Sequence, residues 1–249
     1  MTDADARIAA WLATLERTYL ADMTSSEVAR ALRALSSCYV ERRSTLASGD
    51  ALGSRGKRAA FALFYGPLHF IVSREVVRAL SPTTAIARIL DLGCGTGAAG
   101  AAWALESDAR IIRGYDRHPW AIEEANATYA HFGLNGRANR RDITRTTLGG
   151  DRRTGILLAY AVNELTADGR ARLLAQLLAA HRSGARVLVI EPISRRATPW
   201  WEEWQAIVER AGGKADEWRF AIALPATQHA LARAAGLNPR ELTARSLWL

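Results

Sequence analysis

The chain has few of the residues that would tie it to a metal, a disulfide or a membrane. Its two cysteines, Cys38 and Cys94, form neither a disulfide framework nor a metal-ligand spacing, so we expect no metal site. No apolar run reaches the roughly 18 to 20 residues that span a bilayer. The N-terminal "MTDADARIAAWL" also lacks the apolar stretch of a secretory signal. We therefore expect a cytoplasmic protein with no membrane partner.

Lysine is almost absent as well. Lys57 and Lys214 are the only two, so nearly all of the 33 basic residues are arginine, and 25 acidic residues leave a net charge of +8. A basic surface favours a nucleic-acid partner, although a solvated basic face on an enzyme has the same composition. The arginines that could follow a phosphate backbone are Arg137, Arg140, Arg141, Arg145, Arg152, Arg153, Arg195 and Arg196.

Strand patterns are missing from the first third of the chain. Residues 1–84 show helical spacing of apolar residues, and "TSSE" (Thr24 to Glu27) is typical of a helix-capping box. Gly66–Pro67 is expected to break or kink a helix in the same region. We predict an all-helical N-terminal domain over residues 1–84.

From residue 85 to 249 strand and helix patterns alternate. We expect strands near 87–93, 110–116, 138–143, 155–162, 185–192, 218–224 and 244–249, and helices near 98–105, 118–133, 167–182 and 198–212. This alternation predicts an α/β domain with a doubly wound, mostly parallel sheet of seven strands. Ligands of such sheets bind beyond the carboxyl ends of the strands.

A glycine-rich loop follows the first of these strands. In "ILDLGCGTG", Gly93, Gly95 and Gly97 alternate between the strand and the next helix, a pattern that allows close approach of a ligand to the backbone. The loop also satisfies a dinucleotide pattern. Asp91 favours a cationic ligand group over a pyrophosphate, because a neighbouring carboxylate repels an anion. S-adenosylmethionine carries an ammonium and a sulfonium.

The pattern D-x-G-x-G-x-G resembles the first motif of class I methyltransferases, and the resemblance covers residues 85–249. It implies S-adenosylmethionine as cofactor. Asp116, at the end of the second strand, can accept hydrogen bonds from both ribose hydroxyls, and by resemblance Asp142 would accept one from adenine, although it could simply cap a turn. The expected cofactor-binding residues are Asp91, Gly93, Cys94, Gly95, Gly97, Asp116, Arg117, Asp142, Ile143 and Tyr160.

The fourth strand runs into "AVNEL", with Asn163 and Glu164 where this fold presents the methyl group. The segment lacks the Pro-Pro-aromatic sequence of base-amine methyltransferases, which disfavours that chemistry. Glu164 is the candidate general base or substrate anchor, and Asn163 the candidate polar contact. Alternatively, Asn163 bonds within its own turn and Glu164 stabilises the start of the next helix.

"AYAVNEL" and "VLVIEPISRR", with "SSCYVERRSTL" and "FYGPLHF" in the helical region, resemble the methyltransferase-like family of small-ribosomal-subunit assembly proteins. That family tends to have Gly-Ala-Gly-Pro-Gly in its loop, whereas this chain has Gly-Cys-Gly-Thr-Gly. Its mitochondrial members have cysteines that could hold an iron–sulfur cluster, and this chain lacks such a set. The resemblance implies RNA or a ribosomal particle as partner.

Three further residues are candidates for substrate contact: Tyr65, His69 and Trp200. Tyr65 and His69 could close over the cofactor, and Trp200 could stack on a base, although aromatic residues in apolar surroundings often pack in a core. The favoured function is methyl transfer to RNA, with ribosomal RNA as the expected substrate. The alternatives are a ribosome-assembly factor that binds the cofactor without catalysis, and a methyltransferase for a small molecule.

Overall fold

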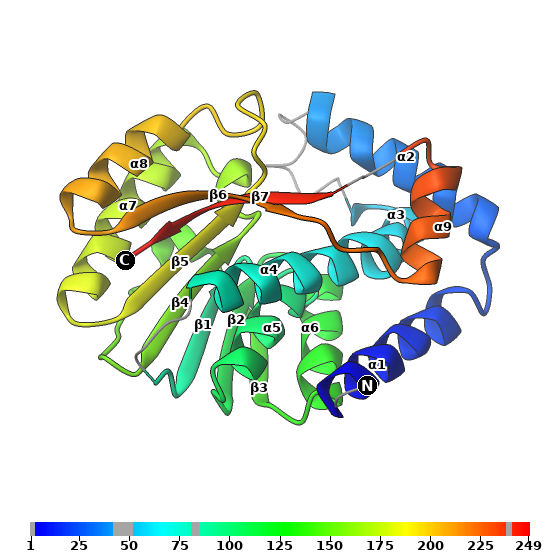
Figure 1. Ribbon diagram of the computed structural model, residues 1–249, viewed down its shortest axis with the longest axis horizontal. Coiled ribbons are helices and arrows are strands. Elements are labelled where there is room, and N and C mark those ends of the chain that lie inside the picture. Colours follow the sequence, from blue (N-terminus) through cyan, green and yellow to red (C-terminus); the bar gives the residue numbers. More distant parts are fainter. Residues whose placement is uncertain (1–2, 42–51, 81–84, 238–240) are drawn as a thin grey trace. The chain divides into compact units, whose positions relative to one another are not determined.

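The protein divides into two compact units. The computed structural model describes residues 3–41, 52–80, 85–237 and 241–249 (Figure 1). One unit is helical and combines residues 1–69 with 221–242, and the other combines residues 70–220 with 243–249. The division therefore falls near residue 70 rather than at the predicted 84. The segment 221–242 belongs to the helical unit although it follows the sheet strands in sequence.

The helical unit is built from short amphipathic segments. Its elements are α1 (Asp3–Tyr19), α2 (Ser25–Glu41), α3 (Arg55–Ala60), the π-helical turn η3 (Phe61–Tyr65), the start of α4 (Gly66–Leu80) and α9 (Ala226–Ala234). The predicted capping box at α2 is confirmed: the Thr24 N–H donates to Glu27 Oε2 at 2.8 Å, and the Glu27 N–H donates to Thr24 Oγ1 at 3.3 Å. The two reciprocal bonds explain why the helix begins there.

Gly66–Pro67 does not break the helix. The chain passes from α3 through the π-helical turn into α4, because Pro67 has no N–H to donate to the carbonyl of Leu63 four residues earlier. That carbonyl instead accepts a hydrogen bond of 2.8 Å from the side chain of Gln228, on α9. Helix α9, "ATQHALARA", was not predicted; it lies between two strand patterns. Its place in this unit depends on contacts with residues more than 150 positions away.

The second unit contains the predicted sheet. Its strands are β1 (Arg88–Leu92), β2 (Ile111–Asp116), β3 (Asn135–Arg140), β4 (Thr154–Ala159), β5 (Arg186–Glu191), β6 (Lys214–Phe220) and β7 (Leu242–Trp248). They lie in the order β3-β2-β1-β4-β5-β7-β6, with β1 to β5 parallel and β7 antiparallel to β5. The predicted α/β fold with seven strands is confirmed. The third strand begins at Asn135, three residues earlier than expected, and β6 ends at Phe220 rather than near 224.

Helices cover both faces of this sheet (Figure 1). The helices α5 (Ala98–Glu106) and α6 (Pro119–His131) pack against β1, β2 and β3, and α7 (Ala167–Arg182) and α8 (Trp201–Arg210) pack against β5 and β6. The central strands β4 and β5 are buried on both faces, which explains their nearly continuous apolar sequences. The strand β3 lies at the sheet edge and is polar, with arginines on its exposed positions.

Candidate active site

The glycine loop connects β1 to α5 in a backbone conformation that other residues rarely adopt. Gly93, Gly95 and Gly97 have φ angles of 72°, 51° and 74°. A Cβ atom on Gly93 would lie 2.6 Å from the Cβ of Ala161, and one on Gly97 would lie 2.7 Å from the ring of Tyr129. The glycines therefore let the loop pack directly against the segment that follows β4 and against α6.

Asp116 holds this loop against the end of β2. Its Oδ2 atom accepts the N–H of Gly95 at 3.0 Å, and its Oδ1 atom accepts the N–H of His118 at 2.9 Å. A carboxylate oxygen can accept more than one hydrogen bond, so each keeps capacity for a ligand hydroxyl. The half-buried Asp116 side chain thus fits the predicted role at a ribose, and it has a structural role that the sequence did not indicate.

Asp91 lies beneath the loop rather than on its surface. Its side chain is 1% exposed, and the hydroxyl of Tyr129 donates to its Oδ2 atom at 3.3 Å. Burial raises the pKa of the Asp91 carboxyl to about 7, and the charge of Asp116 adds to the rise. Cys94 is also buried, and burial raises the pKa of its thiol. Asp91 and Cys94 therefore support the loop from below, and a direct contact of either side chain with the cofactor stays a prediction.

Asp142 caps the short helix η4 (Ile143–Arg145) after β3. Its Oδ1 atom accepts the N–H of Thr144 at 2.9 Å and the Thr144 hydroxyl at 2.7 Å, while its Oδ2 atom lies 3.8 Å from Arg145 Nε. The turn-capping alternative is thus realised, and Oδ2 remains the atom for the predicted contact with adenine. Ile143 is buried in the core cluster beside the loop, and Arg117 is exposed.

Asn163 is held by two partners on other elements rather than by its own turn. It lies in η5 (Val162–Glu164), just after β4, where Tyr160 has a positive φ of 59°. The indole Nε1 of Trp200 donates to Asn163 Oδ1 at 3.0 Å, and Asn163 Nδ2 donates to Glu191 Oε2 at 2.6 Å. Because an indole N–H only donates, this pairing defines the orientation of the amide. One amide hydrogen is left for a further partner.

Glu191 is the site residue that the sequence interpretation missed. It is the last residue of β5 and is fully buried, and its Oε1 atom accepts the N–H of Val162 at 3.0 Å. Burial raises the pKa of Glu191 to about 8, whereas the hydrogen bonds from Val162 and Asn163 and the charge of Arg245 act in the opposite direction. An acidic residue ending a buried apolar strand is the signal that could have revealed it.

Glu164 lies with the charged groups at the carboxyl ends of β2 and β4. Burial raises the pKa of its carboxyl to about 7, the charge of Asp116 raises it further, and Arg117 lowers it. The cap of α7 is Thr166, whose hydroxyl accepts the N–H of Gly169 at 3.2 Å. The structure therefore assigns the capping of that helix to another residue, and a chemical role for Glu164 stays a prediction.

The three predicted substrate residues lie in aromatic clusters. Tyr65 and His69 are partly buried in the helical unit, with ring centroids 6.0 Å apart, and burial lowers the pKa of His69 to about 3. Their role in closing over a cofactor stays a prediction. Trp200 is 6% exposed and packs against Trp204 at 4.8 Å, so it offers no free ring face for a base. The stacking hypothesis for Trp200 is therefore replaced by its hydrogen bond to Asn163.

The described residues show neither a metal-binding cluster nor a helix able to span a membrane. No group of three or more His, Cys, Asp or Glu side chains there is placed to hold a metal ion. None of the helices in the described ranges has both the length and the apolar character needed to cross a bilayer.

Comparisons with known proteins bear on the fold and on the class of the domain. A family model described as "Methyltransferase small domain" matches residues 72–153. A candidate O-methyltransferase from Nostoc punctiforme is 14% identical with a TM-score of 0.55, over 88% of this chain and 72% of that one. The YcgJ protein from Bacillus subtilis is 14% identical with a TM-score of 0.47, over 72% and 96% of the two chains. No curated protein matches the sequence.

The fold, the family match and the loop define the class of this protein: it is an S-adenosylmethionine-dependent methyltransferase with the class I fold. The donor set at the loop fits this cofactor, because Asp116 keeps free lone pairs beside three glycines that admit a ligand to the backbone. The family match covers 82 of the 249 residues and defines the class of enzyme rather than a particular subfamily.

Proposed function

We propose that the protein transfers a methyl group to RNA. The observation that carries the proposal is a strip of exposed arginines along the sheet edge, beside the predicted cofactor residues. The strip consists of Arg117, Arg137, Arg140, Arg141 and Arg145. It continues to the carboxyl end of the sheet, because Arg140 pairs with Asp116 in the register of β2 and β3 and the Arg141 N–H donates to the Asp116 carbonyl at 2.8 Å.

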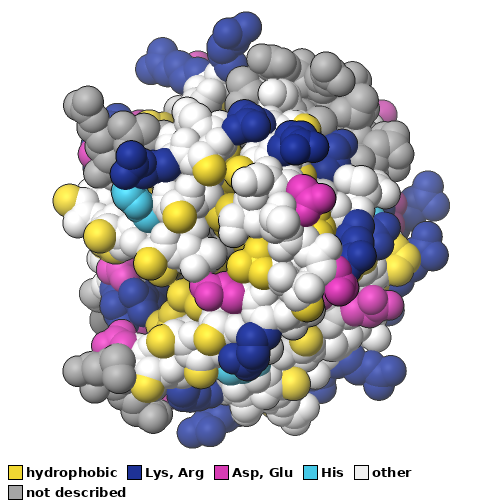
Figure 2. All heavy atoms as spheres, turned by 90° about the vertical axis from the view of Figure 1, so that its right-hand side faces the viewer, with side chains coloured by type: hydrophobic (Ala, Val, Ile, Leu, Met, Phe, Trp, Pro, Cys, Tyr) yellow, Lys and Arg dark blue, Asp and Glu magenta, His cyan; other side chains and the backbone are white. Residues whose placement is uncertain are grey.

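The charges of this arginine strip are largely available to a ligand. Within the described residues only Arg145 of the strip has an ion-pair partner, Asp142 at 3.8 Å. Arg141 lies over the ring of Tyr115, 5.0 Å from its centroid, which restricts the guanidinium without neutralising it. Figure 2 shows Lys and Arg side chains spread over one face of the molecule, between acidic and apolar groups. Exposed basic side chains thus occur elsewhere on the molecule too. The arginine strip differs from them in its position beside the predicted cofactor residues.

In this proposal the residues after β4 position the acceptor. S-adenosylmethionine, when bound, supplies an activated methyl group for displacement by a nucleophile. Asn163 presents its remaining amide hydrogen in an orientation defined by Trp200 and Glu191. Glu164, with its pKa raised to about 7, is suited to accept a proton from the nucleophile near neutral pH. Methyl transfer depends mainly on the positioning of the reacting groups. We therefore expect the orientation of the acceptor by Asn163 to contribute more to the rate than proton transfer to Glu164.

Ribosomal RNA is the proposed substrate because of the resemblance in the segments around Asn163 and Glu191. Among solved structures of similar fold, one is a tRNA (uracil-54, C5)-methyltransferase from Pyrococcus abyssi and another a glycopeptide N-methyltransferase. One observation favours the alternative of binding without catalysis: two of the hydrogen-bonding groups of Asn163 are already occupied within the protein.

Labelled methyl transfer to small ribosomal subunits and to isolated RNA tests the proposal. We expect incorporation into RNA, and an Arg137/Arg140/Arg141→Ala variant should lose at least about tenfold in RNA affinity, with a weaker salt dependence. A variant with Ala at Arg172, Arg182 and Arg210, which are exposed on α7 and α8, is the matched control. RNA binding without incorporation would favour the assembly role, and labelling of small molecules alone would contradict the proposal.

A further inference from the structure

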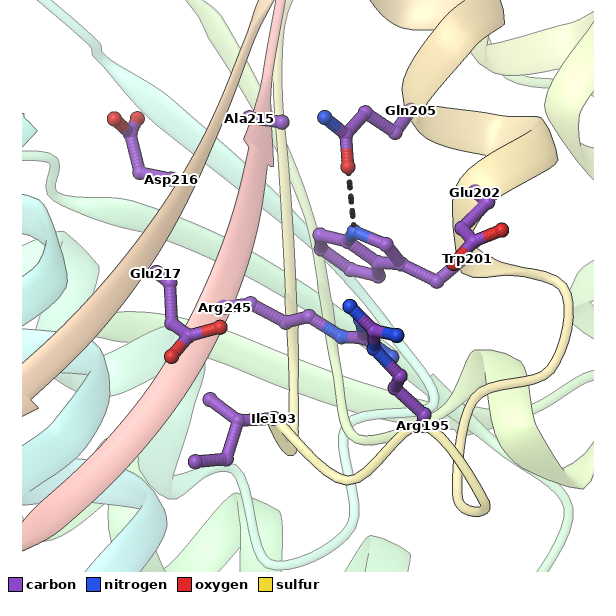
Figure 3. A pocket seen from close by; sticks show the side chains of 9 residues that line it. All are labelled: Ile193, Arg195, Trp201, Glu202, Gln205, Ala215, Asp216, Glu217 and Arg245. Carbon is purple, nitrogen blue, oxygen red and sulfur yellow. Dashed lines mark hydrogen bonds between the residues drawn. The ribbon is translucent and has the colours of Figure 1, made fainter.

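A cleft lies between α8 and the strands β6 and β7, near the candidate active site. Its volume is about 240 Å³, and Arg195, Trp201, Gln205, Glu217 and Arg245 are among the residues that line it (Figure 3). The volume is below the roughly 300 Å³ at which pockets for drug-sized ligands begin. A cleft of this size suits a part of a larger molecule, such as one phosphate with its sugar.

Two arginines meet in this cleft. Figure 3 shows the side chain of Arg245, from β7, and that of Arg195, from the loop after β5, lying next to each other beside the ring of Trp201. The guanidinium carbon of Arg245 lies 4.2 Å from the centroid of that ring. Burial lowers the pKa of Arg245 most, the charges of Glu191 and Glu217 raise it, and the positive charge of Arg195 lowers it, as expected for two neighbouring cations. A bound anion would relieve this repulsion.

Arg245 has hydrogen-bonding capacity that the protein does not use. The residue is 8% exposed, yet its Nε atom is buried and has no hydrogen-bond partner among the residues that the structure describes. Its Nη2 atom donates to the carbonyl of Thr198 over a long distance of 3.4 Å. An unsatisfied donor on a buried cation costs free energy, so such groups usually have a partner in the working state of a protein. A phosphate or carboxylate accepts hydrogen bonds from a guanidinium in pairs.

Carboxylates surround the two arginines and restrict the kind of ligand. Glu217 is paired with Arg219 at 3.0 Å, while Glu202 and Asp216 also line the cleft. These carboxylates would repel a simple anion. They can, however, accept hydrogen bonds from an anionic ligand that also carries donor groups. A ribonucleotide unit does so, because its phosphate is flanked by hydroxyl and base amino groups.

The cleft is linked to the methyl-transfer segment through β5. Arg245 and Glu191 are register partners on β7 and β5, and Glu191 accepts the hydrogen bond that orients Asn163. The strand β7 is two positions from β4 in the sheet, a separation of roughly 10 Å at the usual strand spacing. The cleft therefore lies within reach of a nucleotide that flanks the modified one.

We infer that this cleft is a subsite for a phosphate of the RNA substrate, bound by Arg195 and Arg245. The inference rests on the proposed function and extends it. The cleft and the arginine strip lie on opposite sides of β4 in the sheet. An RNA that contacts both would cross the carboxyl end of the sheet. Arg195 is exposed and provides the accessible contact, and Arg245 provides the buried one.

Arg195→Ala tests the subsite, with Arg196→Ala as the matched control, since Arg196 is also exposed but does not line the cleft. The probe is a short labelled single-stranded RNA, titrated by fluorescence anisotropy over a series of salt concentrations without cofactor. We expect Arg195→Ala to weaken binding at least about fivefold and to reduce the slope of log K against log salt by about 0.7. Arg196→Ala should bind like the unmodified protein.

A second variant and a second ligand complete the test. Arg245→Gln, after circular dichroism confirms that it is folded, should weaken RNA binding at least as much as Arg195→Ala. Inorganic phosphate should compete with RNA more effectively in the unmodified protein than in Arg195→Ala at equal ionic strength. Equal RNA affinity of the Arg195 and Arg196 variants would overturn the subsite, even if phosphate itself bound there. Because these titrations need no turnover, an absence of methyl incorporation would count against the proposed reaction and not against the subsite.

Discussion

At the scale of single residues, Asn163 shows how a polar side chain at the end of a strand is oriented by residues from other elements. Its amide is oriented by an indole from the segment before α8 and by the carboxyl group of Glu191 from β5, so its geometry depends on three chain segments. Neither partner is close to Asn163 in sequence. The same is true of Asp116, whose carboxylate holds the backbone of Gly95. Both cases show polar side chains that support a neighbouring group besides any contact with a ligand.

Trp200→Phe should show whether the orientation of Asn163 affects turnover independently of cofactor binding. The change removes the N–H that orients Asn163 but keeps a buried aromatic ring. We expect turnover to fall by about 10- to 100-fold, because small losses of positioning are costly, with unchanged affinity for S-adenosylhomocysteine by calorimetry. Trp218→Phe is the control, since it removes an indole hydrogen bond of 2.8 Å from the edge strand β6 to Ser246 on β7. Equal losses in both variants would show that Asn163 does not depend on Trp200.

Glu164→Gln tests the proton-accepting role. A base must be deprotonated to act, so the rate of the unmodified enzyme should rise with pH as the Glu164 carboxyl, with its pKa near 7, loses its proton. The variant should bind cofactor normally, lose about 100-fold or more in turnover, and lack this rise between pH 6 and about 8. Glu123→Gln, at an exposed position of α6, should keep the profile. Unchanged turnover in Glu164→Gln would leave this carboxylate without a chemical role.

At the scale of elements, the glycine loop links three parts of the sheet. It follows β1, its Gly93 and Cys94 N–H groups donate to the carbonyl of Tyr115 at the end of β2, and Gly93 packs on Ala161 after β4. The conformation of the loop at the ligand site therefore depends on how these three strands are placed relative to one another. Its glycines are required by backbone conformation and by contact distance together.

Gly93→Ala should disrupt this arrangement. The φ of 72° costs a non-glycine residue about 1–2 kcal/mol, and the added methyl would lie 2.6 Å from the Cβ of Ala161. We expect calorimetry to show at least a tenfold loss of S-adenosylhomocysteine affinity, with a lower melting temperature. Gly149→Ala is the control, because nothing lies within 4 Å of a Cβ at that position. Normal cofactor affinity in Gly93→Ala would contradict the assigned role of the loop.

At the scale of the whole molecule, the chain leaves the sheet after β6, contributes α9 to the helical unit and returns as β7. The contact of Gln228 with the Leu63 carbonyl is one reason for this path, because Pro67 leaves that buried acceptor without its helical donor. The sheet also depends on the return, since β7 pairs with β5 and separates it from β6. Neither unit is therefore a continuous stretch of sequence.

Gln228→Leu should destabilise the protein by about 1–3 kcal/mol, because it leaves the Leu63 carbonyl buried and unpaired. Urea unfolding measures this loss, and His229→Leu, at the exposed neighbouring position, is the control. Adding Pro67→Ala to Gln228→Leu restores an N–H to the helix and should recover part of the stability. An additive double variant would indicate that the carbonyl does not couple the two residues.

The local patterns of the sequence were sufficient for much of the fold. The alternation of apolar strands and helices predicted the sheet, because it depends on neighbouring residues, whereas cofactor binding at the loop from Gly93 to Gly97 with Asp116 stays a prediction. The boundary between the units and the place of helix α9 in the helical unit were not predictable in this way. They follow from contacts between residues far apart in the chain, which leave no periodic pattern.

The sequence by itself determined the class of enzyme, the order of its elements and the segment after β4 as the place to look for chemistry. Only the tertiary structure decided what surrounds Asn163. It placed Asp91 beneath the loop, brought Glu191 and Trp200 to the amide, and paired Arg245 with Glu191 across two strands. The physical reason is that the direction of a side chain and its burial depend on packing between elements, whereas a strand–loop–helix pattern depends on the local chain.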